Sequence, residues 1–428
     1  MLAKTPRGTE DVLPKKSRIW RYIEGQLADV FQLFGYEEIR TPIFEETELF
    51  QRGIGESTDI VEKEMYTFTD RAGRSLTLRP EGTAPVVRAY LQHKLYGEPQ
   101  PVKLYYIGPM FRYERPQAGR SRQFHQFGAE ALGTQDPAVD AEMIAIPMEL
   151  FRRLGLAGVE VQINSIGCPR CRPGYRAYLI ETLRPSIGEM CADCQRRLER
   201  NPMRVLDCKD ESCNRVKEDL KPILDFLCPE CKDHFQAVQD YLQLLEIPYV
   251  INRHLVRGFD YYTKTVFEIV HSGLGAQSAV AGGGRYDGLI EEVGGPSVPA
   301  VGFAAGMERL MLTLEAAGWE PPIKSGAEVY VAGAGETRRT VVDIVFRLRR
   351  AGIAAEMDYL DKSLRAQMKA ANRLNAVWTV IVGEDEAAKN LAVVRHMESG
   401  RQEEVPIDTI TDWLKEQLAA RSCRGAEE

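Results

Sequence analysis

Eight of the nine cysteines lie in one segment, residues 168–231, and this cluster is the strongest constraint that the sequence places on the fold. They form four pairs, spaced by two or four intervening residues: Cys168 and Cys171, Cys191 and Cys194, Cys208 and Cys213, Cys228 and Cys231. Paired thiolates at such spacings suit tetrahedral zinc, and eight could hold two ions. A secreted disulfide scaffold would usually be short and would follow a signal sequence, and we see neither property here. Reduced thiols without metal are the alternative, so zinc occupancy is left open.

The cysteine-rich segment interrupts a chain in which helix and strand patterns are mixed. Apolar periodicity predicts helices at 17–34, 80–96, 137–154 and 306–317. Strands are expected at 65–68, 76–78, 102–107, 110–113, 123–130, 159–163, 249–255 and 265–270. We therefore predict a domain spanning 1–325, interrupted at 168–235 by a small, mostly helical insertion.

A second, smaller domain is expected after Pro321-Pro322, a dipeptide typical of a stiff linker. Beyond it, segments 328–332, 338–351, 354–357, 362–374 and 376–382 alternate between strand and helix patterns, and a last helix is expected at 408–420. This rhythm predicts a small α/β domain over 326–428.

Composition and charge exclude several classes of protein. Of the 428 residues, 44% are apolar, which is too many for a mainly disordered chain. The 55 basic and 62 acidic side chains give a net charge of −7, which excludes a globally basic nucleic-acid binder but not a local basic cleft. The sequence has neither a membrane-length apolar run nor a signal pattern, so a cytoplasmic protein is expected.

The most charged short segment, 111–126, contains four arginines and the acid Glu114. Arginine presents a planar fork that matches phosphate oxygens, and neighbouring aromatic rings can stack on a base. The segment could hold a nucleotide or an RNA end, or it could be a solvated charged hairpin.

Three more segments combine glycine with charged or aromatic residues: 256–263 (VRGFDYYT), 281–288 (AGGGRYDG) and 302–309 (GFAAGMER). The glycine run is typical of a tight turn or of close approach by a ligand, and its spacing fits neither a Walker loop nor a dinucleotide-binding fingerprint. The third segment leads from a strand into a helix, where small residues allow close packing.

Taken together, these segments resemble class II aminoacyl-tRNA synthetases and, more narrowly, the histidyl-tRNA synthetase family. The three class II motifs correspond to 41–45 with 55–61, to 111–114 with its loop, and to 302–309. Segments 78–84, 257–262 and 283–287 resemble motifs of the histidine enzymes alone. The resemblance covers nearly the whole chain. One departure is Phe259, where the family more often has leucine, and both residues are apolar.

The resemblance implies an α+β catalytic domain with an antiparallel class II synthetase sheet of six or seven strands, a homodimer formed through the first motif, and a C-terminal α/β anticodon-binding domain. It implies that histidine is activated by ATP, with Mg²⁺ on the phosphates, and then passes from histidyl-adenylate to its tRNA. No metal is obligatory for the insertion in this family.

The family also implies roles for particular residues. The expected catalytic residues are Arg112 and Arg257, one on each side of the α-phosphate. Expected in ATP binding are Arg112, Glu114, Arg120, Phe124 and Arg309. Expected around histidine are Glu81, Thr83, Gln126, Glu130, Tyr261, Tyr262 and Tyr286, with Glu130 and Tyr262 on the imidazole nitrogens. Expected to contact tRNA are Gln117, Arg122, Lys362, Arg365, Lys369 and Arg373, the last four on one helix face.

Two other functions are open to such a chain. A catalytically silent relative of this domain serves as a regulatory subunit of ATP phosphoribosyltransferase, but such subunits lack the tail domain. A prolyl or threonyl class II enzyme is the other alternative, and the pair Glu130 and Tyr262 favours an imidazole substrate over those side chains.

Overall fold

The computed structural model describes residues 3–55, 58–273, 279–323 and 327–424, with side chains up to 420. The chain divides into two compact units, Met1–Pro321 and Pro322–Glu428, so the division falls within the Pro321-Pro322 dipeptide. The domain boundary expected between 325 and 326 lies outside the described residues, as do Glu56 and Ser57 of the first motif.

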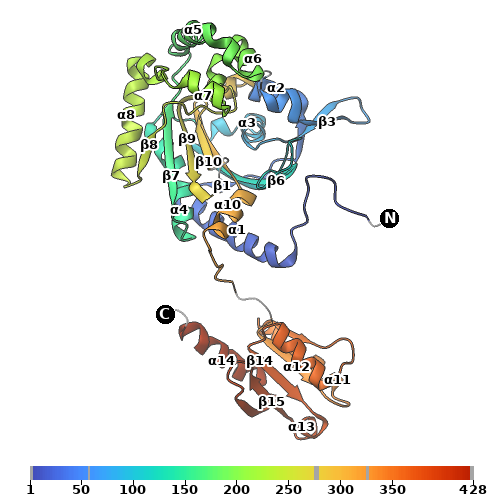
Figure 1. The fold of residues 1–428 in the computed structure, drawn as a ribbon. Coiled ribbons are helices and arrows are strands. Elements are labelled where there is room, and N and C mark those ends of the chain that lie inside the picture. The colour runs from blue at the N-terminus through green and yellow to red at the C-terminus, as the bar shows by residue number, and fades with distance from the viewer. Residues whose placement is uncertain (1–2, 56–57, 274–278, 324–326, 425–428) are drawn as a thin grey trace. The chain divides into compact units, whose positions relative to one another are not determined.

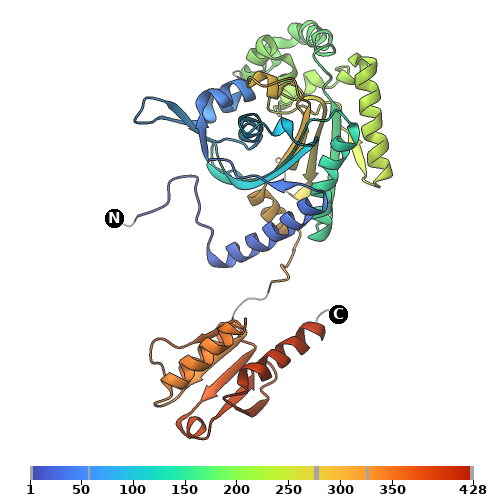
Figure 2. The same cartoon turned by 180° about the vertical axis from the view of Figure 1, so that it is seen from behind.

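The larger unit is built on an eight-stranded sheet in the order β1-β5-β6-β11-β10-β9-β7-β8 (Figures 1 and 2). The six inner strands pair antiparallel, whereas the short edge strands β1 and β8 pair in parallel with their neighbours. The expected antiparallel sheet therefore forms the centre, and two short edge strands enlarge it. The strands are β1 (Glu37–Glu38), β5 (Val102–Phe111), β6 (Gln123–Leu132), β7 (Val159–Ser165), β8 (Tyr249–Ile251), β9 (Thr263–His271), β10 (Ala279–Arg285) and β11 (Ala300–Gly306).

Helices α1 (Pro14–Leu33) and α4 (Pro137–Arg153) pack against this sheet. The apolar spacing of α1 places Ile23, Leu27 and Val30 in the main core, where they are almost completely buried. Helix α10 (Met307–Ala316) follows directly from β11, as the sequence predicts. A separate three-stranded sheet, β2-β4-β3, comprises β2 (Phe44–Glu46), β4 (Ser75–Leu78) and β3 (Tyr66–Thr69).

Two sequence expectations differ from the structure. The segment 102–107 and the first two residues of the segment 110–113 form one continuous strand, β5, although Pro109 lies within it. Arg112 and Tyr113 lie beyond its end. The edge strand β1 pairs only with Leu104 and Tyr105, so the outer edge of β5 carries no ladder partner at Pro109 and proline is tolerated there. The glycine run 282–284 lies in strand β10 and not in a turn. A Cβ on Gly283 would lie 2.2 Å from the carbonyl oxygen of Gly302, so close strand packing requires glycine.

The cysteine-rich insertion is mostly helical, as expected. It contains α5 (Arg172–Leu183), α6 (Ala192–Arg200), α7 (Glu211–Lys217) and several 3₁₀ turns, and it leads into α8 (Pro229–Leu244). Helix α8 continues beyond residue 235, and Phe235, Val238 and Leu242 are buried in the main core. The last helix of the insertion therefore also belongs to the body of the larger unit.

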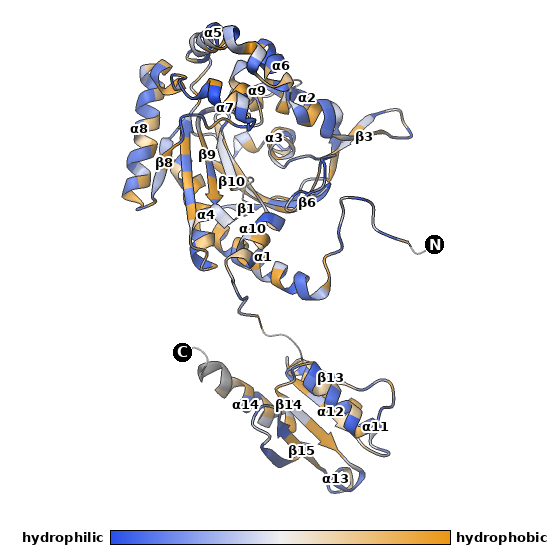
Figure 3. Ribbon diagram, in the orientation of Figure 1, coloured by the Kyte–Doolittle hydropathy of each residue, from blue (hydrophilic) through white to orange (hydrophobic). Residues whose placement is uncertain are grey.

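The smaller unit contains a five-stranded sheet in the order β13-β12-β14-β15-β16 with its own apolar core. Its strands are β12 (Val329–Gly333), β13 (Ala355–Met357), β14 (Trp378–Val382), β15 (Leu391–His396) and β16 (Gln402–Pro406). Figure 3 shows the central strand β14 in hydrophobic colours, as befits a strand with neighbours on both sides. Helices α11 (Arg338–Arg350), α12 (Leu364–Arg373) and α14 (Ile410–Arg424) complete it. No described helix of either unit is long and apolar enough to cross a membrane.

A buried ion pair joins α4 to the end of β10. The Arg285 guanidinium and the Asp140 carboxylate are both fully buried, with Nε of Arg285 3.2 Å from each oxygen of Asp140. Arg285 also donates to the carbonyl oxygen of Thr134 at 2.8 Å, and His234 of α8 lies 3.2 Å from Asp140. One carboxylate thus ties three elements together.

Replacing Asp140 with alanine would leave the buried Arg285 charge with only Asp287, at 3.2 Å, as a carboxylate partner. We expect the Asp140→Ala variant to lose about 3–5 kcal/mol of unfolding free energy, the usual scale when one member of a buried pair is removed. The urea dependence of hydrogen exchange in peptides from α4 and β10 would measure this loss of unfolding free energy. The matched control on the same helix is Glu149→Ala, which removes a partly exposed pairing with Arg152 and Arg153 and should cost about 1 kcal/mol or less. Equal losses in the two variants would contradict the role of Asp140.

Candidate active site

A cavity of about 450 Å³ opens on the large sheet, and most of the sequence-predicted site residues line it. Its floor includes Gln126 of β6, Gly282 of β10 and Gly302 of β11, and the loop 256–262 forms part of its wall. The predicted residues that line it are Glu81, Thr83, Arg112, Glu114, Arg120, Phe124, Gln126, Arg257, Tyr261, Tyr262, Tyr286 and Arg309. Residues separated by more than two hundred positions thus meet in one pocket.

Arg112 stands where β5 ends. Its Nε donates to the carbonyl oxygen of Pro80 at 2.8 Å, and its guanidinium carbon lies 5.2 Å from the centre of the Phe124 ring. Glu114 forms an ion pair with Arg120 at 3.1 Å and lies 3.9 Å from Arg112. The hairpin therefore presents two arginines to the cavity in orientations set by main-chain and carboxylate partners.

Arg257 enters the cavity from the loop that precedes β9, and its guanidinium pairs with Glu268. Burial lowers the pKa of Arg257, but Glu268 and Tyr262 raise it, and the net shift is upward, so the side chain stays cationic. A Cβ on Gly282 would lie 2.7 Å from a guanidinium nitrogen of Arg257. Glycine at 282 is thus what lets the guanidinium lie against β10.

Arg309 lies in the first turn of α10. It donates to the carbonyl oxygen of Ala279 at 2.8 Å, and burial lowers its pKa. Its neighbour Glu308 accepts the main-chain N–H of His125 at 2.9 Å and lies 3.1 Å from Nδ1 of the same histidine. These bonds fasten the start of α10 to β6.

The other part of the cavity is lined by buried polar groups. Glu81 accepts the N–H groups of Thr83 at 2.6 Å and Ala84 at 2.8 Å, and thereby caps α3 (Thr83–Gln92). Burial raises the pKa of Glu81, and these N–H groups oppose the shift. The Oε1 atom of Gln126 is buried and has no hydrogen-bond partner among the described residues. It is an acceptor available to a ligand that donates.

Glu130 is fully buried and does not itself line the cavity. Its carboxylate accepts from Thr83 Oγ1 at 2.7 Å and from the Tyr286 hydroxyl at 2.5 Å, and the Tyr106 hydroxyl lies 3.4 Å away. Thr83 and Tyr286 are themselves cavity residues, so Glu130 reaches the cavity through them. Burial is the largest cause that raises the pKa of Glu130 to about 8.

Several residues that sequence reasoning missed complete the site. Glu268 lies within strand β9 with no motif around it, and its role is visible only from its pairing with Arg257. Asp207 and Lys209 of the insertion also line the cavity. Glu308 could have been found, because it directly precedes the arginine of the third class II motif.

The residues predicted to contact tRNA lie outside the cavity. Gln117 is exposed in a tight hairpin, where it exchanges main-chain hydrogen bonds with Arg120. The Arg122 guanidinium stacks 3.9 Å from the centre of the Tyr113 ring. In the smaller unit, Arg365, Lys369 and Arg373 are exposed at four-residue spacing on α12. Lys362 is also exposed but precedes the helix, so the expected stripe of four on one helix is a stripe of three with a fourth cation before it.

The eight clustered cysteines gather in two sets of four. One contains Cys168, Cys171, Cys228 and Cys231, and the other contains Cys191, Cys194, Cys208 and Cys213. Within each set the sulfur atoms all lie within 4.8 Å of one another. The first pair of the sequence thus joins the fourth, and the second joins the third.

Comparison with known proteins agrees with this geometry. A family model described as histidyl-tRNA synthetase matches residues 8–170 and 200–310, and one described as anticodon binding domain matches 328–417. The crystal structure of apo histidyl-tRNA synthetase from S. aureus has a TM-score of 0.83 and 42% identity, covering 97% of this chain and 100% of that one. The fold is that of a class II aminoacyl-tRNA synthetase.

Curated relatives narrow the assignment. The histidine–tRNA ligase of Desulforamulus reducens is 54% identical over 416 residues, which is 97% of this chain and 99% of the relative. That of Moorella thermoacetica is 54% identical over 420 residues, 97% of this chain and 98% of the relative. The chain belongs to the histidyl-tRNA synthetase family.

The raised pKa of Glu130 predicts a pH-dependent stability. Between about pH 4.5 and 8 the folded state keeps this proton while the unfolded state loses it, so unfolding free energy should fall as pH rises. The loss should approach about 1.4 kcal/mol per pH unit in that window. The Glu130→Gln variant, without an ionisable group, should lack this slope. Urea unfolding of both proteins from pH 5 to 9 would test it, with Glu149→Gln, at a partly exposed carboxylate, as the control. If the unfolding free energy depended on pH in the same way in wild type and Glu130→Gln, the raised pKa of Glu130 would be refuted.

Proposed function

We propose that the protein attaches histidine to its cognate tRNA in protein synthesis, using ATP and passing through histidyl-adenylate. The observation that carries this proposal is the convergence in one cavity of Arg112, Arg257 and Arg309 with a polar pocket backed by Glu130. The histidine–tRNA ligases that match almost the full chain at 54% identity support it. A translation enzyme that consumes tRNA and ATP is expected in the cytoplasm.

In the first step, the carboxylate of histidine attacks the α-phosphorus of ATP. A bond forms between carboxylate oxygen and phosphorus, the bond to the bridging oxygen breaks, and pyrophosphate leaves with the electron pair. Negative charge grows on the non-bridging oxygens, which Arg112 and Arg257 would meet as preoriented cations. The nucleophile belongs to the substrate, so the protein contributes positioning and charge.

The remaining cavity residues bind the two substrates in this proposal. Phe124 and Arg309 would hold the adenine ring between them, and Glu114 would accept its amino group, while Arg120 would contact phosphate. Mg²⁺ prefers oxygen ligands and would neutralise phosphate charge, and Glu308 offers carboxylate oxygens on the cavity wall.

The polar part of the cavity suits an amino acid with an imidazole side chain. Glu81, Thr83 and the unpartnered oxygen of Gln126 would receive the ammonium group. Tyr262 would bond one imidazole nitrogen, and Glu130 would bond the other, directly or through the Tyr286 hydroxyl to which it is already bonded. Tyr261 packs 4.6 Å from Tyr262, ring centre to ring centre, and would hold that phenol in place.

The second step transfers histidine to the terminal ribose of tRNA. Gln117 and Arg122 of the hairpin would contact the end of the acceptor arm. In the smaller unit, four exposed cations would follow the RNA backbone near the anticodon. They are Lys362, which precedes α12, and Arg365, Lys369 and Arg373 on α12. The match of the smaller unit to anticodon-binding domains supports this role.

A homodimer is also part of the proposal. The strand β2 belongs to the first class II motif. Phe44 of β2, Phe68 of β3 in the same sheet and Ile43, directly before β2, are between 44% and 46% exposed. Neighbouring exposed apolar side chains of this size are typical of a surface that another chain covers.

The regulatory-subunit alternative is not favoured. The chain matches an anticodon-binding domain over 328–417, which such subunits lack, and its near-full-length curated relatives are histidine–tRNA ligases. A prolyl or threonyl enzyme is not favoured, because the near-full-length curated relatives are histidine–tRNA ligases.

Amino-acid-dependent exchange between pyrophosphate and ATP tests the proposal directly. We expect exchange with histidine and none above background with the other nineteen amino acids, because only imidazole satisfies both Tyr262 and the Glu130 network. Charging of tRNA should require the same amino acid. A folded protein that catalyses exchange with none of the amino acids would instead support the regulatory role. Exchange that depends on proline or threonine would show that this amino acid, and not histidine, is the substrate.

The mechanism makes a sharper prediction about Arg257. A cation that acts as charge develops should raise the rate more than the affinity. We expect Arg257→Ala to lower the single-turnover rate of adenylate formation about 10²–10³-fold, while the dissociation constants of histidine and ATP change little. Arg257→Lys should recover only part of the rate, because a point charge lacks the planar fork. The matched control is Arg253→Ala, an exposed arginine on the same loop. Near-normal adenylate formation in Arg257→Ala would mean that this arginine is structural.

A further inference from the structure

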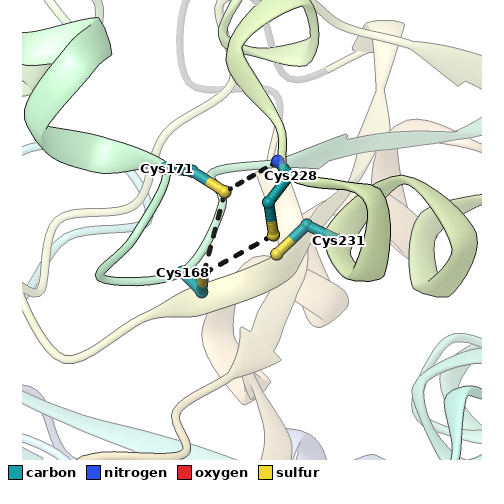
Figure 4. A group of neighbouring side chains, drawn as sticks. All are labelled: Cys168, Cys171, Cys228 and Cys231. Atoms are coloured by element: carbon teal, nitrogen blue, oxygen red, sulfur yellow. Dashed lines mark hydrogen bonds between the residues drawn. The ribbon is translucent and has the colours of Figure 1, made fainter.

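The spacing of the sulfur atoms in the two cysteine sets fits metal coordination better than disulfide formation. Cys168 Sγ lies 3.7 Å from Cys171 Sγ and 4.0 Å from Cys228 Sγ, and Cys191 Sγ lies 3.7 Å from Cys208 Sγ (Figure 4 shows the first set). A disulfide requires about 2.05 Å. Four sulfurs placed tetrahedrally at about 2.3 Å from one zinc ion are about 3.8 Å apart.

A helix begins beside the sulfur atoms at both sets. In the first, Cys171 directly precedes α5 and Cys228 directly precedes α8, so both helices begin beside the sulfurs. In the second, Cys191 directly precedes α6. The positive end of each helix dipole stabilises thiolate over thiol, and thiolate is the form that binds metal. Main-chain N–H groups also donate to sulfur, from Cys228 to Cys171 at 3.1 Å and from Cys191 to Cys213 at 3.2 Å.

A buried cation beside the second set supplies an independent argument. Lys217 is only 6% exposed, and its Nζ donates to the carbonyl oxygens of Leu206 at 3.1 Å and Cys208 at 2.5 Å. Among the described residues it forms no ion pair with a carboxylate. A buried ammonium without counter-charge is costly. A zinc ion held by four thiolates carries a net charge of −2 and would provide that counter-charge.

We infer that the two cysteine sets are two structural zinc sites, each of four thiolates, and that the second site fixes part of the active-site wall. Cys208 is flanked by Asp207 and Lys209, and both of these residues line the cavity. A metal bond at Cys208 therefore immobilises the segment that carries them.

The same part of the insertion holds the loop next to Arg257. Asn201 donates to Asp260 at 2.7 Å, and Arg204 donates to the carbonyl oxygen of Gly258 at 2.6 Å. Cys194 and Cys213 are fully buried in the apolar cluster that also contains Tyr261 and Tyr262. Loss of the second zinc should thus loosen both 201–209 and 256–262. The meaning of this wall for catalysis rests on the proposed function, but the metal content does not.

Metal analysis tests whether the two cysteine sets bind zinc. The full-length wild-type protein is purified without chelator and under reducing conditions. We expect two zinc ions per chain, and zinc X-ray absorption showing four sulfur ligands at about 2.3 Å. Metal-free protein with all cysteines reactive to thiol reagents would overturn the inference, as would disulfides within the sets or iron in place of zinc.

Variants then assign each ion to its set. Cys231→Ser and Cys194→Ser should each contain one zinc ion, and the double variant none. Cys423→Ser is the matched control, because Cys423 is the cysteine outside both sets, and it should keep two. Unchanged zinc content in both single variants would refute the assignment.

Hydrogen exchange tests the link to the cavity. In Cys194→Ser, amides of 201–209 and 256–262 should exchange at least tenfold faster than in Cys423→Ser, while β5 and β6 keep their protection. If Cys194→Ser unfolds, slow zinc removal from wild type by chelator gives the same comparison. Zinc loss without faster exchange in these two segments would show that the second ion does not support the wall.

Discussion

The buried pair of Arg285 and Asp140 is the interaction on which the rest of the active site depends. It joins the last residue of β10 to α4, and the next residue, Tyr286, is thereby directed to the carboxylate of Glu130. Glu130 in turn accepts from Thr83, the first residue of α3. A single ion pair, which water cannot screen, thus connects a helix, two strands and the start of a second helix. Its energy depends on close geometry, because desolvation of both charges must be offset by their bonds.

Glycine makes the other contribution to this geometry. Gly282 leaves space for the guanidinium of Arg257, and Gly302 leaves space for Glu130, whose Oε2 would lie 1.7 Å from a Cβ at that position. Both glycines lie in extended strands, so they serve the packing of polar side chains on the sheet and not a turn. The arginines of the cavity are held by carboxylates or carbonyls before a substrate arrives, which is what electrostatic catalysis requires.

Much of the fold could be predicted from patterns of neighbouring residues. The helical spacing of α1, the change from β11 to α10 and the alternation in the smaller unit all follow from local periodicity, and the structure confirms them. The prediction was less accurate where a partner strand decides the outcome. Separate strands were expected at 102–107 and 110–113, yet the open outer edge of β5 accommodates Pro109 within one strand. The glycines of β10 suggested a turn, yet close packing against β11 places them in a strand.

The sequence by itself determined the chemical inventory of the site, because arginine forks, carboxylates, phenols and thiols are recognisable by type and spacing. It also determined that the cysteines come in pairs. Tertiary structure decided which groups meet. It joined the first cysteine pair to the fourth, brought Glu268 of an unremarkable strand to Arg257, and placed Glu130 behind Tyr286. Local sequence cannot specify such contacts, since they depend on strand order and on the ion pairs and close packing that form only after distant segments have been brought together.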